Sequence, residues 1–334
     1  GDVGLERMSV DPDRLQRDLA TIARFTVPGL PWTRRPFTPE YAAARSWLQE
    51  EMARCGLQTR LDPAGNLIGV LPGTEPSLPP ILIGSHTGTV EGGGRFDGIL
   101  GVLAGLEVVR QLRAAGRRLR HTLEVVDFLA EEPTDFGVST VGSRGVVGNL
   151  TPHLLDRREP NGRTLREALR QICGDPDRLQ AAVRPPGSVF PYLELHIEQG
   201  PVLASRGEPL GTVSGIVGIQ RYQVNVTGRP DHAGTTPMDL RRDALTAASS
   251  WILALEETCR RTYASPVVGT VGRIHVEPNA TNVVPGAVTL HAEVRSESCA
   301  VIAEVGAGSG RSRTVSQRSG RCRWRSSPRP TPPR

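Results

Sequence analysis

The stretch Gly84–Gly105 joins a strand end, a glycine-rich loop and a helix start, and it constrains the fold more than any other segment. The apolar run at residues 81–83 is short, as in a strand that is buried on both faces of a parallel sheet. Such a strand delivers His86 to its carboxyl end, where open α/β sheets bind ligands. After the loop, Asp97 precedes an apolar pattern of helical period. We predict His86 and Asp97 as metal ligands; a loop histidine and a helix N-cap are the alternatives.

Two further predicted strands end in ligand-type side chains. The apolar segment 121–130 leads into Glu131 and Glu132, and adjacent carboxylates repel each other unless a cation lies beside them. In Tyr192–Gly200, polar and apolar residues alternate, which places His196 on the polar face between two glutamates. A solvated acidic loop and a surface histidine are the alternatives when each motif is taken alone. Taken together, these side chains indicate a metal site.

The order of predicted elements indicates two domains. Strands alternate with helices over residues 57–200, which predicts an α/β domain with a doubly wound, mainly parallel sheet. From about Gly211 the order becomes strand, helix, strand, strand, which is typical of a small α+β domain with an antiparallel sheet. We therefore place a metal-binding catalytic domain in residues 1–210 and a small domain in residues 211–300.

Charge separates the C-terminal end from the rest of the chain. Residues 305–334 hold eight arginines and no acidic residue, so the net charge of +5 becomes −3 for residues 1–304. All 40 basic residues are arginine, as in the product of a GC-rich gene. We interpret residues 301–334 as a disordered or out-of-frame tail, and both domains as C-terminally truncated. The acidic body argues against nucleic-acid binding.

Apolar runs and cysteines restrict the compartment. No run approaches the roughly 20 apolar residues that span a bilayer. The five cysteines are scattered and form neither a CxxC spacing nor a disulfide framework. Such usage is typical of reducing compartments, so we expect a cytoplasmic protein that does not bind membranes.

Eight segments together resemble the dinuclear-metal M20-type amidase and peptidase family. Within it they are most similar to the carbamoylase branch, which includes N-carbamoyl-L-amino-acid hydrolases, allantoate amidohydrolases and β-ureidopropionases. The segments are GSH (84–86), GGRFDGILGVLAGLEV (93–108), EE (131–132), GSR (142–144), ELHIEQGPVL (194–203), HAGTTPM (232–238), RRDAL (241–245) and NVVPG (282–286). The resemblance implies a metal-dependent hydrolase of linear amide C–N bonds in N-carbamoyl or ureido amino acids.

The resemblance also implies a role for each ligand-type residue. His86 and His196 would bind one metal ion, and Asp97 would bridge two ions. Glu132 would bind the second ion, and Glu131 would be the general base for a water. Imidazole and carboxylate ligands suit zinc, manganese, nickel or cobalt.

Residues of the substrate site follow from the same resemblance. Gln199, Asn282 and Arg295 would contact the substrate, and Arg295 suits a carboxylate. His232 would polarise the scissile carbonyl. The small domain would act as a lid and would mediate a homodimer.

Two departures from the family pattern affect the metal site. Gly88 stands where the family has an aspartate that orients the first histidine. No histidine follows His291 to serve the second metal ion. We therefore expect an impaired second site. The alternative to an active enzyme is an inactive truncated remnant, or a one-metal binding module of the same fold.

Overall fold

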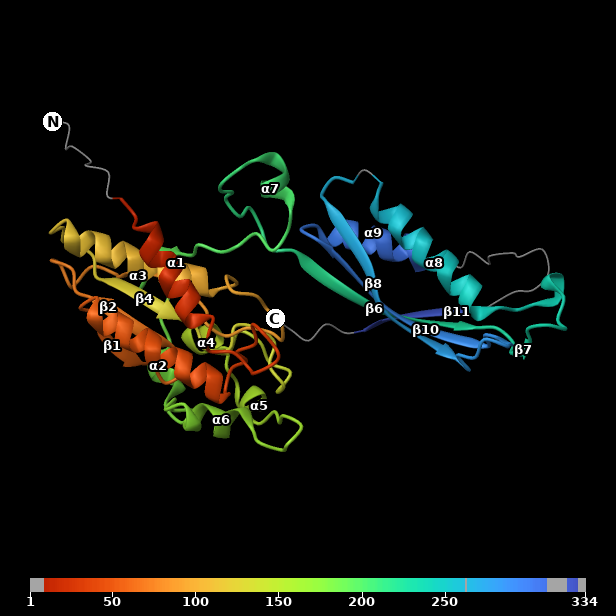
Figure 1. Ribbon diagram of the computed structural model, residues 1–334, viewed down its shortest axis with the longest axis horizontal. Coiled ribbons are helices and arrows are strands. Elements are labelled where there is room, and N and C mark those ends of the chain that lie inside the picture. Colours follow the sequence, from red (N-terminus) through yellow and green to blue (C-terminus); the bar gives the residue numbers. More distant parts are fainter. Residues whose placement is uncertain (1–8, 262, 311–322, 330–334) are drawn as a thin grey trace. The chain divides into compact units, whose positions relative to one another are not determined.

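The computed structural model describes residues 9–261, 263–310 and 323–329. The chain divides into two compact units, Gly1–Pro209 and Leu210–Arg334 (Figure 1). None of the helices in the described ranges combines the length and the apolar character that a membrane span requires.

The first unit is built on a five-stranded sheet. Its order is β1 (Gln58–Leu61), β2 (Leu67–Leu71), β4 (Leu123–Asp127), β3 (Ile81–Ser85) and β5 (Tyr192–Leu193). Strand β3 runs parallel to β4 and β5, whereas β2 runs antiparallel to β1 and β4. The sheet is therefore mixed: β1, β4, β3 and β5 share one direction and β2 runs against them, so the prediction of a mainly parallel sheet holds except for β2. The turn between β1 and β2 is too short for a crossover, so these strands form a hairpin, which reverses the direction of β2.

Three helices pack against this sheet in one hydrophobic core (Figure 1). They are α1 (Pro12–Ile22), α2 (Pro39–Arg54) and α3 (Ile99–Ala114). The side chains of Asp11 and Thr38 cap α1 and α2, and each helix has a proline in its first turn, a pattern that is typical of helix starts. Helix α3 differs, because its N-cap is Gly98 and no side chain caps it. The alternative that Asp97 is the N-cap of this helix is therefore wrong.

Short elements complete the first unit. They are α4 (Val141–Val146), α5 (Pro152–Leu155), α6 (Leu165–Gln171), the 3₁₀ helix η1 (Leu179–Ala182) and α7 (Val202–Arg206). The buried side chain of Asn66 links α4 to the segment that follows β4. Its amide nitrogen donates to Asp62 (2.8 Å) and to the Gly142 carbonyl (3.1 Å), and its oxygen accepts the Leu129 N–H (3.0 Å). These bonds fix the segment that leads to Glu131.

The second unit holds a four-stranded antiparallel sheet. Its order is β11 (Arg323–Arg329), β6 (Gly218–Thr227), β10 (Ala287–Ser296) and β8 (Val267–Glu277). Strands β7 (Asp231–His232) and β9 (Val283–Val284) form a separate ribbon, and the 3₁₀ helix η2 spans Met238–Leu240. Helix α8 (Ala244–Cys259) packs against the large sheet through Trp251 and Leu255.

The sequence predicts a disordered or out-of-frame tail from residue 301, but residues 301–310 are helical. They belong to α9 (Cys299–Gly310), in which Val301, Ile302 and Val305 are buried in the core of the second unit. Apolar residues at positions i, i+1 and i+4 lie on one helix face, which explains why this segment folds onto the sheet. Strand β11 pairs with β6, and residues 311–322 and 330–334 lie outside the described residues.

Candidate metal centre

The ends of β3 and β4 and the start of α3 bring the predicted ligands of the first unit together. His86 directly follows β3, Asp97 lies two residues before α3, and His196 lies three residues after β5. The ligand atoms of these three side chains lie within 4.8 Å of one another. A second such group, with the same limit, consists of His86, Glu131 and Glu132. The two groups share His86.

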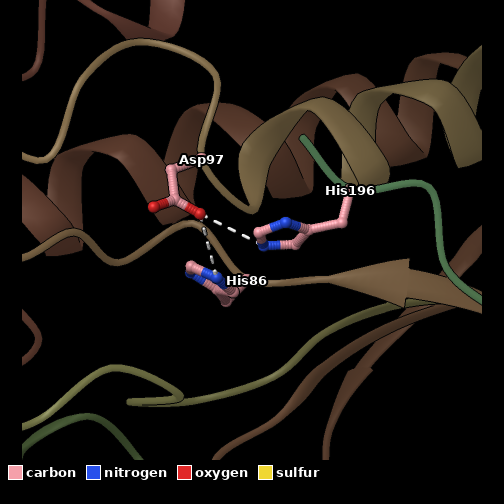
Figure 2. A group of neighbouring side chains, drawn as sticks. All are labelled: His86, Asp97 and His196. Carbon is pink, nitrogen blue, oxygen red and sulfur yellow. Dashed lines mark ion pairs between the residues drawn. The ribbon is translucent and has the colours of Figure 1, made fainter. Parts of the chain in front are cut away.

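One carboxylate oxygen of Asp97 faces both imidazole rings (Figure 2). The Asp97 Oδ1 atom lies 3.1 Å from His196 Nε2 and 3.9 Å from His86 Nε2. His86 and Asp97 are buried, and His196 is partly exposed. The Asp97 Oδ1 atom is itself buried and accepts no hydrogen bond from the described part of the chain.

Each histidine is oriented by a nearby backbone carbonyl. His86 Nδ1 lies 2.8 Å from the Gly88 oxygen, and His196 Nδ1 lies 2.8 Å from the Ile197 oxygen. A carbonyl can only accept, so both Nδ1 atoms carry hydrogen and each neutral ring has its lone pair on Nε2. Both lone pairs then point at Asp97 Oδ1. A cation between the two nitrogen lone pairs and the carboxylate oxygen would relieve their mutual repulsion. Two imidazoles with a carboxylate are suitable ligands for a divalent transition metal.

The second group contains two carboxylates beside the same imidazole. Glu131 Oε2 lies 3.5 Å from His86 Nε2. Burial and the neighbouring Glu131 charge raise the pKa of Glu132. A cation beside the pair would favour the ionised form of both carboxylates.

Two glycines allow the start of α3 to approach the ligands closely. Gly98 has φ +68°, and a Cβ atom added there would lie 2.3 Å from the His86 Cε1 atom. A Cβ atom added at Gly101 would lie 2.3 Å from the carbonyl oxygen of Leu195, one residue before His196. These positions require glycine because backbone and ring occupy the space of a side chain.

Gln199 is the predicted substrate residue that lies at this centre. Its side-chain amide donates to Asp97 Oδ2 at 2.7 Å. Its backbone has a positive φ of 57°, a conformation that non-glycine residues rarely adopt. Its contact with substrate stays a prediction.

The other predicted substrate residues belong to the second unit. His232 and Asn282 lie close together, because the Ala233 N–H donates to the Asn282 carbonyl at 3.0 Å. The Gly234 N–H donates to His232 Nδ1 at 3.1 Å, so the neutral ring carries its hydrogen on Nε2. Arg295 lies apart from them, eight residues along β10 from Ala287, a rise of roughly 27 Å. Its guanidinium bonds to Glu293 (2.7 Å).

Two residues of the centre escaped prediction as functional residues. The carboxylate of Glu194 accepts the Ser85 hydroxyl at 2.5 Å and the Tyr192 hydroxyl at 2.7 Å, which ties the His196 segment to β3. Asp127 is a fully buried carboxylate at the end of β4. For Asp127 the available signal was a charged residue at the end of a buried strand, where charges are rare.

Known proteins resemble this chain in sequence. A family model described as peptidase family M20/M25/M40 matches residues 69–308. An N-carbamoyl-L-amino acid amidohydrolase of Geobacillus stearothermophilus is 45% identical over 278 residues, 81% of this chain and 68% of that protein. Allantoate deiminase 1 of Glycine max is 34% identical over 273 residues, 75% of this chain and 56% of that protein. The chain thus spans between about half and two thirds of these relatives' lengths.

A solved structure is similar over nearly the whole chain. A hydantoinase/carbamoylase family amidase from Burkholderia ambifaria has a TM-score of 0.85 and 32% sequence identity, with 96% of this chain and 78% of that chain covered. The mixed α/β fold of this chain is therefore that of the amidase. The resemblance that the motifs predict is confirmed: the chain belongs to peptidase family M20/M25/M40, a family of hydrolases.

Proposed function

We propose that this chain is a metal-dependent amidohydrolase that cleaves the linear amide C–N bond of an N-carbamoyl or ureido amino acid. The observation that carries the proposal is the buried Asp97 Oδ1 atom, toward which two histidine lone pairs point. This donor set fits a divalent cation. The substrate class is supported by the amidohydrolase and the deiminase to which the chain is similar.

The reaction consumes one water molecule. The C–N bond breaks, the carbonyl carbon gains the water's hydroxyl group, and the departing nitrogen gains the water's other proton. The carbamic acid that remains loses CO₂, so that ammonia and the free amino group are both released. Divalent ions, when bound, activate water and polarise the carbonyl oxygen. His86, His196, Asp97 and Glu132 would hold them. Glu131 would take the water's proton and return it to the departing nitrogen.

Residues of the second unit would bind and polarise the substrate. His232 presents an Nε2–H donor, which suits a carbonyl oxygen that gains negative charge during attack. Arg295 would pair with the substrate carboxylate, while Gln199 and Asn282 would orient the ureido group. We further propose that this unit is a lid and mediates a homodimer.

Ammonia release tests the proposal. The purified chain, loaded in turn with zinc, manganese, nickel and cobalt, is supplied with N-carbamoyl-L-amino acids and with allantoate. We expect ammonia with at least one pairing, and we expect Glu131→Gln to retain metal but lose turnover. Absence of ammonia with every metal and both substrate types would refute the activity.

A one-metal binding module is the second candidate. Both ligand groups share His86, which favours this candidate. A single ion bound by His86, Asp97 and His196 would already use every histidine of the centre. Elemental analysis separates the candidates. Two tightly held ions per chain support the hydrolase, whereas one ion without hydrolysis supports the binding module.

A further inference from the structure

A buried carboxylate on β4 holds the turn that follows His86. Asp127 has no exposed surface. Its Oδ1 atom accepts the Thr87 backbone N–H at 2.8 Å, and its Oδ2 atom accepts the Thr87 hydroxyl at 3.0 Å. The same Oδ2 atom accepts Arg45 Nε at 2.7 Å, so the buried charge is paired. Asp127 therefore binds the residue next to a predicted metal ligand without touching that ligand's ring.

Two buried arginines complete the anchor. Arg45 also donates to the carbonyl of Asp127 (3.0 Å) and to that of Gly65 (2.7 Å). Arg34 Nε donates to the Thr87 carbonyl at 2.9 Å. Both backbone groups of Thr87 are thus held, its N–H by a carboxylate and its carbonyl by a guanidinium. Charge-assisted bonds of this kind are stronger than neutral ones, so the peptide that follows is fixed as well.

That peptide carries the carbonyl that orients His86. The Gly88 oxygen accepts His86 Nδ1–H at 2.8 Å. No side chain at position 88 takes part, and little room exists for one: an added Cβ atom would lie 3.1 Å from Pro36 Cγ and 3.5 Å from Tyr41 Cε2. The orienting contact is therefore a backbone atom whose position depends on the anchor at Thr87.

We propose that Asp127 is a positioning residue of the metal centre. Through Thr87 it places the Gly88 carbonyl, which keeps the hydrogen of His86 on Nδ1 and leaves Nε2 free for the metal ion. The carboxylate that supports the first histidine thus comes from β4 rather than from position 88. This inference deepens the proposed function, since it concerns the same centre.

Histidine ring spectra test the proposal directly. Long-range ¹H–¹⁵N spectra of the metal-free full chain, near pH 9 where a typical imidazole with a pKa of about 6.5 is neutral, distinguish the two tautomers. His86→Gln identifies the His86 signals. We expect hydrogen on Nδ1 of His86 in the wild type. Hydrogen on Nε2 would overturn the proposal before any variant of the anchor is made.

Asp127→Asn tests the role of the carboxylate. An amide in either orientation sets its NH₂ group against a donor, either the Thr87 N–H or Arg45 Nε. We expect a mixture of His86 tautomers and a zinc affinity about 10- to 100-fold weaker in competition with a chromophoric chelator. If this variant does not fold, Thr87→Val, which removes only the hydroxyl contact, is expected to shift both readouts in the same direction by less.

Glu107→Gln is the matched control. Glu107 is another buried carboxylate paired with an arginine, Arg14 (2.6 Å), but it contacts no residue of the His86 turn. We expect its zinc affinity and its His86 tautomer to equal those of the wild type. A folded Asp127→Asn chain that behaves like this control would refute the positioning role. Absence of ammonia release from a wild type that has both expected readouts would refute only the proposed hydrolysis.

Discussion

Replacing Gly98 with alanine would place a methyl group inside the ring of His86. The added Cβ atom would lie 2.3 Å from Cε1 and 2.4 Å from both ring nitrogens, whereas non-bonded carbon atoms prefer about 3.5–4.0 Å. The ring or the loop must therefore move by more than about 1 Å, and His86 is only 2% exposed. A shift of that size removes the His86 lone pair from Asp97 Oδ1.

Gly92→Ala separates this clash from backbone strain. Gly92 has φ +61°, close to the +68° of Gly98, and an added Cβ atom there has nothing within 4 Å. In both variants a non-glycine residue at positive φ costs on the order of 1–3 kcal/mol of unfolding free energy. For a domain of this size the melting temperature falls by about 2–12 °C. Only Gly98→Ala carries the additional displacement of a ligand.

Zinc competition and thermal unfolding of the metal-free chain measure the two effects. We expect the melting temperature of Gly92→Ala to fall with zinc affinity unchanged. We expect Gly98→Ala to unfold at least as early and to bind zinc at least about 10-fold more weakly, since a disturbed ligand geometry weakens metal binding. Equal zinc affinity in the two variants would show that His86 is not held at the centre by the start of α3.

Two further predictions concern stability. Burial opposes ionisation of Glu107, but bonds from Arg14, Gln111 and the Asp11 N–H outweigh it and lower its pKa from 4.5 to about 2. The ionised Glu107 side chain therefore stabilises the fold fully above pH 4.5, and this stabilisation is lost as the pH falls toward 2. The free energy of unfolding of Glu107→Gln should depend less on pH in that range than that of the wild type. An equal dependence on pH in the two chains would contradict this. Asn66→Ala leaves three buried partners unpaired, at about 1–3 kcal/mol each. Urea unfolding should therefore show that the free energy of unfolding falls by at least about 3 kcal/mol. A fall of less than about 1 kcal/mol would contradict the hydrogen bonds of Asn66.

Local signals predicted the elements of the first unit better than their pairing. Asp11 and Thr38, each followed by proline, predict where α1 and α2 begin, because an N-cap depends on residues within one turn. The direction of β2 depends on its partner β4, which lies more than fifty residues away along the chain. Alternation of strands and helices carries no information about such a long-range pairing, so the antiparallel pairing of β2 with β4 was not predicted.

The candidate site was predictable in its residue types but not in its supports. His86 and Glu131 follow apolar strands, and the carboxyl ends of adjacent parallel strands meet at one edge of a sheet. The bond from Thr87 to Asp127 joins residues 40 positions apart. No motif spacing encodes that contact, and a glycine at position 88 suggested a missing support. The structure shows a backbone carbonyl in that place.

The carbonyl partners of the two histidines have a kinetic consequence. Each lies within two residues of its own ring, so neither orientation depends on the other half of the centre. The segment around His196 is largely exposed, whereas the turn after His86 is buried. Exposed segments with few buried contacts open locally at low free-energy cost. We therefore expect an ion to leave by detachment of His196 first, with His86 still aimed at the vacated position and ready to rebind.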